Sequence, residues 1–552
     1  MSNRFRIVPA VVGAALVVLT IATSVRTAPQ QSAGARMPKL IVILVADQMR
    51  FDYLERYSGR FTGGLKRLMQ DGAWFQHAAY PYLNTVTCPG HSTIGTGTLP
   101  YQHGMILNTW FDRKTRAATD CTDDERTKEI SYNSALSGPG DSGRRQLKPT
   151  LADHVRQQAH GRVVTMSMKA RSAIGLAGHG GDLVLWFDTR GAFTTSTAYA
   201  HALTPFVRKY IDDNPVTAAY GRQWERLYDP ALYQYRDDNP SEKAPSGWTR
   251  TFPHVIASKS GKPDAEFYGH WMRSPLSDEY LGKLAATAVE TMQLGKGNGV
   301  DFLGVSFSAL DLVGHAFGPN SHEVQDVVAR LDVTIGELLN HLDASVGAGN
   351  YVLAFSADHG VGDIPEEVHG GRYTSAVTSG VVDKALEPFL GVRKNIAYAA
   401  YTDLYLQDQA LKRIRKDPAA RTAVLDALRA LPGIAAAFTA DEVAAPAARS
   451  AADPIKRAAA LSYHEGRSGD VIIVPRENWL LTTSATSHGT LYPYDQRVPI
   501  ILYSAGVRKG IYHAQITPAD IAPSLGALAE IQMTGTDGHP VTEAFAHQMS
   551  TR

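Results

Sequence analysis

The sequence predicts an α/β fold built on a central, mostly parallel sheet. Short and nearly continuous apolar runs recur along the chain, as expected for strands that are buried on both faces. They lie at residues 39–46, 163–168, 302–308, 351–357, 470–475 and 498–504. Helical patterns lie between several of these runs; in residues 322–346, for example, apolar residues recur every three and four positions. Strands that alternate with helices indicate an α/β architecture.

Two stretches interrupt this alternation. Residues 190–285 are rich in tyrosine, tryptophan, proline and charge, and residues 365–465 hold alanine-rich helical patterns. We interpret both as insertions that decorate or cap the sheet. The aromatic residues of the first insertion either line a substrate entrance or form a small satellite core.

The composition of the 552 residues, 44% hydrophobic and 20% charged, is that of a soluble globular protein and excludes general disorder. A formal net charge of +1 provides no basic field for a polyanion, so nucleic acid is not expected as a partner. Any anionic substrate must therefore be held by local groups.

The N-terminal segment has the pattern of a secretory signal. Arg4 and Arg6 precede an apolar stretch that begins at Ile7, and small and polar residues follow it. We predict a signal peptide at residues 1–28 and a periplasmic or secreted protein. The alternative is an uncleaved membrane anchor, because the apolar stretch is almost long enough to span a bilayer. In an oxidising compartment, the two cysteines, Cys88 and Cys121, either form a disulfide or remain as buried thiols.

Carboxylates and imidazoles cluster beside the predicted strands. Taken singly, each is better explained as a helix cap or a surface residue. In an open α/β sheet, however, ligands bind beyond the carboxyl ends of the strands, where such groups converge. Mixed carboxylate and imidazole ligands suit zinc or a similar ion. The residues in question are Asp47, Asp311, His315, Asp358, His359 and His488.

Thr87 is the candidate nucleophile, in the string NTVTCPGH. Pro89 and Gly90 would turn the chain into a helix whose N-terminus presents free N–H groups to an anion. A threonine hydroxyl is a weak nucleophile and needs a metal ion or a base beside it. Thr85 and Ser92 compete for the role, and Thr87 could instead be a helix N-cap.

Seven strings carry a family resemblance that extends over most of the chain: VADQMRFDYL, NTVTCPGHSTIGTG, HGMILNTWFD, SMKARSAI, SALDLVGHAFGP, SADHGVGD and TSHGTLYPYDQRVPI. The chain resembles the alkaline phosphatase superfamily. Within it, the chain looks like the phosphate-irrepressible alkaline phosphatases that use a threonine nucleophile and are related to nucleotide pyrophosphatase/phosphodiesterases. The resemblance implies a three-layer sandwich and a catalytic domain over residues 36–552.

The resemblance also implies two zinc ions per chain. One would be held by Asp47, Asp358, His359 and Thr87, and the other by Asp311, His315 and His488. His369 is the rival for the last ligand, but the family's sequence context is met only at His488. His91 and His103 match positions that the family does not use as ligands, so we interpret both as structural.

Three further positions match the family's substrate-binding residues. Asn108 would hydrogen-bond a phosphoryl oxygen. Lys169 and Arg171 look like the pair that distinguishes monoesterases from diesterases, and we expect them to point the same way on an extended segment. Lysine would act as a point charge and arginine as a two-pronged donor. The alternative is two solvated residues at a strand end.

The implied reaction is hydrolysis of small-molecule phosphate monoesters through a phosphothreonine intermediate. The first alternative is a phosphodiesterase or nucleotide pyrophosphatase of the same superfamily. The second is a non-catalytic periplasmic protein that binds metal or phosphate. A sulfatase is disfavoured, because Cys88 is followed directly by Pro89 and the arginine of the sulfatase motif is missing.

Overall fold

The computed structural model describes residues 1–2, 37–133, 138–188, 190–503 and 506–546. The chain divides into two units, Met1–Gly34 and Ala35–Arg552. The predicted signal peptide, residues 1–28, lies outside the described residues except for the first two. Among the described residues, no helix has both the length and the apolar character needed to cross a membrane.

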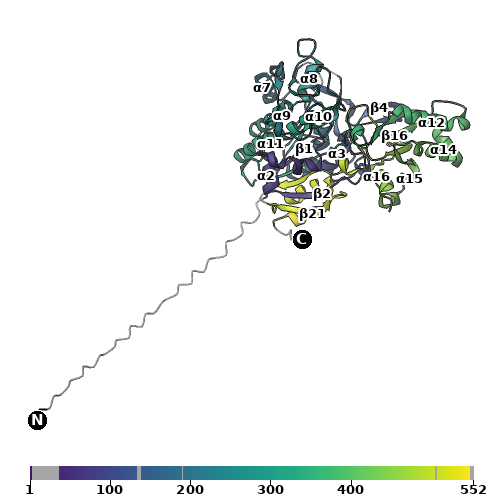
Figure 1. The fold of residues 1–552 in the computed structure, drawn as a ribbon. Coiled ribbons are helices and arrows are strands. Elements are labelled where there is room, and N and C mark those ends of the chain that lie inside the picture. Colours follow the sequence, from purple (N-terminus) through teal and green to yellow (C-terminus); the bar gives the residue numbers. More distant parts are fainter. Residues whose placement is uncertain (3–36, 134–137, 189, 504–505, 547–552) are drawn as a thin grey trace. The chain divides into compact units, whose positions relative to one another are not determined.

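The second unit is organised around an eleven-stranded sheet (Figure 1). Its five central strands run parallel, in the order β13 (Tyr351–Ser356), β1 (Leu40–Ala46), β12 (Asp301–Phe307), β7 (Val163–Ser167) and β8 (Leu183–Phe187). Beyond β13 follow β20 (Ile500–Tyr503), β2 (Ala73–Ala78) and β21 (Gly510–Ile516). Beyond β8 follow β9 (Phe193–Ser196), β5 (Asp123–Ser131) and β6 (Pro139–Asp141).

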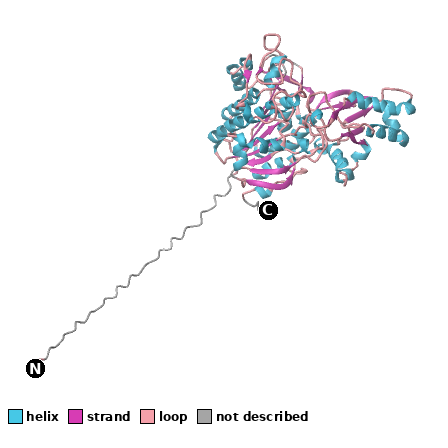
Figure 2. Ribbon diagram, in the orientation of Figure 1, coloured by secondary structure: helices cyan, strands magenta, loops and turns pink. Residues whose placement is uncertain are grey.

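Helices cover both faces of this sheet, which explains why its central strands are apolar throughout (Figure 2). Alternate side chains of β1 point to opposite faces. Leu40, Val42 and Leu44 share one core with residues of α9 (Pro275–Thr291) and α11 (His322–Leu342). Ile41, Ile43 and Val45 share the other core with residues of α3 (Thr87–Thr96) and α18 (Ile521–Leu528). The predicted α/β sandwich is thereby confirmed.

Apart from a second sheet and its helices, which are described next, the other helices and strands are short. They are α1 (Phe51–Tyr57), α2 (Gly64–Asp71), α4 (Pro100–His103), α5 (Leu151–His154), α6 (Ala170–Ala177), α7 (Pro205–Asp213), α8 (Ala265–Met272), α10 (Ala309–Phe317), α17 (Pro493–Gln496), β3 (Thr109–Asp112), β4 (Ala117–Asp120), β10 (Gln223–Trp224), β11 (His254–Val255), β14 (Gly371–Arg372) and β19 (Trp479–Leu480).

A second sheet of four strands follows β13 in the chain. Its order is β15 (Ile396–Ala400), β16 (Asp403–Leu406), β18 (Val471–Pro475) and β17 (Ile434–Thr439), and all of its pairings are antiparallel. One face packs against α12 (Ser375–Leu390), α13 (Asp408–Lys416) and α14 (Pro418–Arg429). The other face packs against α15 (Ala440–Ala444) and α16 (Pro454–Ser462).

Two of the predicted strands differ from the expected parallel pattern. The run at 470–475 becomes β18, which lies in the second sheet and not in the central one. It is apolar throughout for the same reason as β1: Val471 and Ile473 face one core, and Ile472 and Val474 face the other. The run at 498–504 contains β20, which does join the central sheet but pairs antiparallel with β13.

The aromatic residues within 190–285 are largely part of the main core. Trp224, Trp248, Phe267 and Trp271 are buried and belong to the same cluster as the α9 and α11 face of the sheet. These side chains therefore hold the segment against the central sheet, and none of the four is placed at an entrance.

Candidate active site

Strand order explains why the predicted ligands meet. Asp47 directly follows β1, Asp358 lies just after β13, and Asp311 lies in the first turn of α10, which follows β12. Since β13, β1 and β12 are adjacent and parallel, their carboxyl ends lie at one edge of the sheet. All three carboxylates are buried, with exposed fractions of 0 to 3%.

The first group of atoms consists of ligand atoms without hydrogen bonds. His359 Nε2 lies 3.2 Å from Asp358 Oδ2 and 3.6 Å from Asp47 Oδ1. Among the described residues, none of these three buried atoms has a hydrogen-bond partner. Buried polar atoms without partners are costly and rare, and converging ones are explained by a group that they bind together. The donor set suits a metal cation.

The second group adjoins the first. His315 Nε2 lies 3.2 Å from Asp311 Oδ1, and His488 Nε2 lies 3.5 Å from the same oxygen. One ligand atom from each of these three residues falls within 4.8 Å of the others. The same holds for Asp47, Asp311 and His359. The two groups are therefore adjacent, and Asp311 lies between them. The rings of His359 and His488 stack with centroids 3.5 Å apart.

The three imidazoles are oriented in the same way. In each of them Nδ1 lies beside a backbone carbonyl oxygen, which can only accept a hydrogen bond, so Nδ1 carries a proton and Nε2 is the nitrogen directed at the site. The pairs are His315 with Thr486 at 3.1 Å, His359 with Gly360 at 2.9 Å, and His488 with Thr85 at 2.9 Å. Burial lowers the pKa of His359 to about 3, so its ring is neutral and able to bind a metal.

The other three histidines considered in the sequence lie elsewhere or are occupied. His369 is exposed on the surface, away from Asp311. His91 is buried, with Nδ1 2.9 Å from the Thr87 carbonyl and Nε2 2.8 Å from Ser306 Oγ. His103 is also buried, and its two ring nitrogens contact Thr93 Oγ1 and the backbone N–H of Met105. His91 and His103 thus connect helix α3 to its surroundings.

Lys169 lies between the carboxylates. Its Nζ is 2.6 Å from Asp47 Oδ2 and 2.6 Å from Asp311 Oδ2. Burial lowers the pKa of Lys169, but the Asp311 and Asp47 carboxylates outweigh it and raise that pKa above its usual value. The pKa of Asp47 is raised well above its usual value by burial and then by Asp358. Burial also raises the pKa of Asp311, but Lys169 and His315 lower it well below its usual value. Three buried carboxylates thus have one ammonium group among them. The excess negative charge favours the binding of additional cations.

Arg171 lies near Lys169, but the local structure differs from the prediction. Lys169 is the N-cap of α6 and Arg171 is the second residue of that helix, so the pair does not lie on one extended segment. Arg171 still acts on Lys169 electrostatically and lowers its pKa. Its buried Nε has no hydrogen-bond partner among the described residues, which leaves a donor for an anion.

Thr87 begins α3 and is 1% exposed. Gly90 allows this helix to approach Asp358, because a Cβ at Gly90 would lie 2.2 Å from the Asp358 carbonyl oxygen. The hydroxyls of both competitors are engaged elsewhere: Thr85 donates to the Thr490 carbonyl and Ser92 donates to Gln146 Oε1. Of the three candidate hydroxyls, that of Thr87 is therefore the one without a hydrogen bond among the described residues, and Thr87 begins the helix that approaches Asp358 at Gly90.

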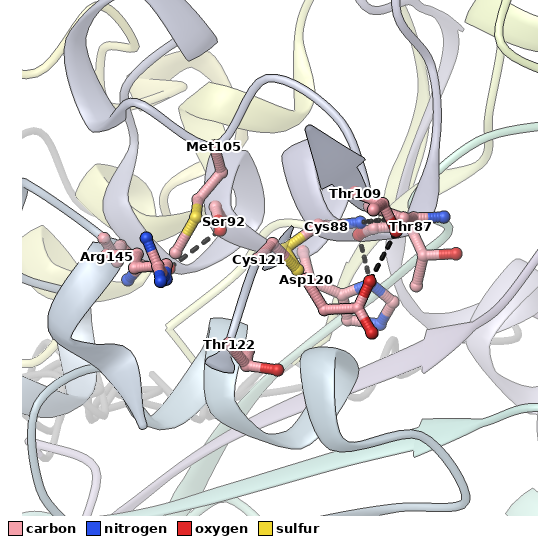
Figure 3. Close-up of a disulfide and its surroundings, with 12 residues drawn as sticks. Thr87, Cys88, Ser92, Met105, Thr109, Asp120, Cys121, Thr122 and Arg145 are labelled. Atoms are coloured by element: carbon pink, nitrogen blue, oxygen red, sulfur yellow. Dashed lines mark hydrogen bonds between the residues drawn. A yellow bond between two sulfur atoms is a disulfide. The ribbon is translucent and has the colours of Figure 1, made fainter. Parts of the chain in front are cut away.

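Asn108 and a disulfide hold the start of α3. The N–H of Cys88 donates to Asn108 Oδ1 at 2.8 Å, and Cys88 is bonded to Cys121, next to the end of β4 (Figure 3). The bond resolves the alternatives left open for the two cysteines. Because Cys88 donates to Asn108 and Pro89 has no N–H, the helix N-terminus offers an anion fewer free amides than predicted. The amide nitrogen of Asn108 has no hydrogen-bond partner among the described residues, so its two N–H groups are free to donate.

Two residues that sequence reasoning missed organise the ligands. Gln48 is buried in the left-handed region at φ 71°; its N–H donates to Asp358 Oδ1 at 3.1 Å and its Nε2 to Asp311 Oδ1 at 2.7 Å. Asp278 accepts hydrogen bonds from the N–H groups of Ser308 and Ala309, at the start of α10. The only sequence signal for Gln48 is its position beside Asp47. Nothing local distinguishes Asp278.

Comparison with known proteins is consistent with this geometry. The family model for type I phosphodiesterase/nucleotide pyrophosphatase matches residues 41–497. Alkaline phosphatase PhoV of Synechococcus elongatus is 32% identical, with 92% of each chain covered. Alkaline phosphatase PafA of Elizabethkingia meningoseptica is 31% identical over 94% of this chain and 96% of that protein.

Solved structures agree on the fold. The crystal structure of wild-type PafA aligns with a TM-score of 0.84 at 30% identity and covers 92% of this chain and 99% of that one. Murine ectonucleotide pyrophosphatase/phosphodiesterase 5 aligns with a TM-score of 0.54 at 12% identity, over 92% of this chain and 100% of that one, and supports the fold alone.

Proposed function

The chain belongs to the type I phosphodiesterase/nucleotide pyrophosphatase family, and from that premise we propose that it is an exported alkaline phosphatase with two zinc ions and a phosphothreonine intermediate. Relatives about 30% identical over more than 90% of the chain are named alkaline phosphatases. The observation that carries the proposal is the meeting of two groups of ligand atoms near the start of α3, whose first residue, Thr87, has an uncommitted hydroxyl.

The side chains fit two metal ions. Asp47, Asp358 and His359 would hold one ion together with the Thr87 hydroxyl. The second would be held by Asp311, His315 and His488. Two bound zinc ions would lower the pKa of a coordinated hydroxyl and stabilise charge on the phosphoryl oxygens. The mixture of carboxylate oxygens and imidazole nitrogens favours zinc over magnesium or calcium.

The protein's own groups position the phosphoryl group. Lys169 and Arg171 bring two positive charges to the site, which suits the dianion of a monoester better than the monoanion of a diester. Asn108 is held by the Cys88 N–H, so its amide nitrogen can donate to a phosphoryl oxygen. His91 holds the Thr87 carbonyl and thereby the backbone that carries the nucleophile.

The reaction then proceeds in two displacements. The Thr87 oxygen forms a bond to phosphorus while the bond between phosphorus and the alcohol oxygen breaks, and the alcohol leaves with a proton. Water next attacks the phosphothreonine, restores the Thr87 hydroxyl and releases inorganic phosphate. Phosphoryl transfer requires mainly positioning and charge stabilisation, which the residues above would supply.

A phosphodiesterase is the second candidate, because the matching family model describes phosphodiesterases. Initial rates on 4-nitrophenyl phosphate, its methyl diester and 4-nitrophenyl sulfate would separate the classes, using protein of measured metal content. We expect the highest kcat/KM for the monoester. Preference for the diester would refute our first choice.

Thr87→Ala tests the nucleophile. We expect turnover to fall by a factor of at least about 10³ while the metal content is retained, because the covalent step is removed. Ser92→Ala, on the same helix, is the matched control and should keep most of the activity. Unchanged activity of Thr87→Ala would show that another group attacks. Metal or phosphate binding without turnover in the native protein would instead support a non-catalytic binding protein.

We also propose that residues 1–28 direct export and that residues 36–552 form the catalytic domain, with insertions at 190–285 and 365–465. The support is the charge and apolar pattern of the first segment. N-terminal sequencing of the protein recovered from the periplasm or medium would test cleavage. An intact N-terminus in a membrane fraction would favour the anchor.

A further inference from the structure

A pocket of about 330 Å³ opens beside the second group of ligands. Its lining includes Asn108, His315 and His488 of the candidate site, together with Leu107 and Tyr398. We propose that this pocket binds the alcohol portion of the phosphate monoester and selects uncharged, planar aromatic alcohols. The inference rests on the proposed function and extends it to a substrate class.

The position of the pocket matches the path of a leaving group. In an in-line displacement, the attacking and leaving oxygens lie on opposite sides of phosphorus. Thr87 lies on the Asp358 side, where Gly90 brings α3 against that residue. The pocket lies on the side of His315 and His488. An alcohol displaced by Thr87 therefore extends toward the pocket.

The lining of the pocket favours a neutral group. Val86, Leu107 and Ala399 contribute apolar surface, and Thr109 and Ser487 contribute hydroxyls. Among the described residues that line it, none is a lysine, arginine, aspartate or glutamate. A charged group that projects away from the proposed metal centre would lose water there without gaining a lysine, arginine, aspartate or glutamate partner, which is costly. A volume near 330 Å³ is within the range of small-molecule sites and accommodates an aromatic ring.

The aromatic ring of Tyr398 lines the pocket and is held in place by its neighbours. Its ring stacks on Phe111 of β3, with centroids 5.9 Å apart and planes 19° apart. It also faces Tyr405, its partner in the pairing of β15 with β16. Because these contacts already restrict the ring, stacking a substrate against it loses little conformational entropy. Tyr401 ties the end of the same segment to the site, since its hydroxyl donates to the His488 carbonyl.

Binding of two non-hydrolysable probes tests the inference without turnover. Benzylphosphonate and methylphosphonate would be titrated calorimetrically into the metal-loaded native protein and into Tyr398→Ala and Tyr398→Phe. We expect the native protein to bind benzylphosphonate at least about tenfold more tightly, as aromatic stacking and burial predict. Tyr398→Ala should lose most of this preference and keep its affinity for methylphosphonate. Tyr398→Phe should behave like the native protein.

Two controls sharpen the test. Tyr463→Ala removes a half-buried tyrosine outside the pocket and should leave both affinities unchanged. A benzylphosphonate with a para carboxylate should bind about tenfold more weakly than the parent compound. Its carboxylate would project away from the proposed metal centre, and the pocket lining contains no lysine or arginine to pair with it. The ratio of kcat/KM for benzyl phosphate to that for methyl phosphate should follow the same pattern across the variants.

The outcomes separate the two proposals. Equal affinity of the native protein for both phosphonates, or a preference that survives Tyr398→Ala, would overturn the pocket proposal and leave the phosphatase intact. Loss of methylphosphonate binding in Tyr398→Ala would also overturn it, because the residue would then support the phosphoryl site itself. Failure of the native protein to bind either phosphonate would overturn both proposals.

Discussion

Gln48 connects carboxylates that come from different strands. Its backbone N–H donates to Asp358 and its side chain donates to Asp311, so one residue holds a ligand from each of the two metal groups. It does so from a left-handed conformation, which side chains other than glycine adopt at a cost. Such strained positions persist where the surroundings over-determine them, often at functional sites. Gln48 is thus a positioning residue for the proposed metal centre.

Replacement of Gln48 by methionine should weaken metal binding. The change keeps the side-chain length but removes the donor to Asp311, and loss of such a partner typically costs about 10- to 100-fold in metal affinity or activity. Competition with a chromophoric chelator would measure the affinity. Gln76→Met is the matched control, since Gln76 donates only to Glu55 on the surface. Equal metal affinity of Gln48→Met and the native protein would contradict this role.

At the scale of elements, the β3–β4 hairpin and the start of α3 form one unit. Asn108 enters the hairpin, accepts from the Cys88 N–H and, through its own carbonyl, accepts from the Cys121 N–H. The disulfide closes this unit covalently, next to Thr87 (Figure 3). The disulfide therefore fixes the proposed nucleophile, Thr87, relative to Asn108, the proposed donor to the phosphoryl group.

Removal of the disulfide should reduce both stability and activity. For the double variant Cys88→Ala with Cys121→Ala we expect a loss of roughly 2–4 kcal/mol in the free energy of unfolding, because the unfolded chain regains freedom. We also expect a several-fold lower kcat, since Asn108 is held less firmly against Cys88. Denaturant unfolding and steady-state rates would measure these effects. A reductant should affect the native protein in the same direction and leave the double variant unchanged.

The second sheet contains a pH-sensitive carboxyl group. Asp403 on β16 is buried and accepts from the Gly469 N–H at 2.7 Å, and burial raises its pKa to about 6. The stability that it contributes is fully present below the unfolded pKa near 4 and is lost as the pH rises through 6. Asparagine imitates the protonated form.

The free energy of unfolding of the Asp403→Asn variant should therefore increase relative to that of the native protein as the pH rises. Between pH 4 and pH 7 we expect the difference in unfolding free energy to move by about 3 kcal/mol in favour of the variant. Denaturant unfolding at several pH values would measure the change. The exposed Asp408→Asn serves as the control. A difference that stays constant with pH would show that Asp403 is ionised across this range in the folded protein.

At the scale of the whole molecule, metal ions would connect distant parts of the chain. The proposed ligands follow β1, β12 and β13, begin α3 or lie in the loop before α17, and His488 is 441 positions after Asp47. Without a metal, Lys169 pairs with two of the three buried carboxylates, Asp47 and Asp311, and acts on Asp358 only through its charge. Metal binding should therefore stabilise the entire fold, and not only the site.

Chelation should lower the melting temperature. A ligand at 100 times its Kd adds about 2.7 kcal/mol per site, which for a chain of this size corresponds to roughly 2–3 °C for one site and about 5 °C for two. Differential scanning fluorimetry before and after chelator treatment would measure the shift, and added zinc should reverse it. Asp311→Asn should show a smaller response. An identical melting temperature with and without chelator would contradict metal binding at these residues.

The sequence by itself determined the fold class and predicted that the candidate site residues meet at one edge of the sheet. Apolar runs report burial on both faces, and residues such as Asp47 and Asp358 lie where adjacent parallel strands end, so local pattern and one topological rule were sufficient. The pattern could not say which sheet a run would join. The run at 470–475 is as apolar as β1 but lies in the second sheet, because helices cover that sheet on both faces too.

Only the tertiary structure decided the contacts between residues far apart in the chain. Several such contacts depend on how helices and strands pack against one another. They are the contacts of Lys169 with Asp47, of Gln48 with Asp311 and of Cys88 with Cys121, and the position of Tyr398 at the pocket. No sequence spacing encodes such contacts, because each forms only after its elements have met. The sequence thus predicted which groups would do the chemistry, and the structure decided which residues orient them and which residues line the adjoining pocket.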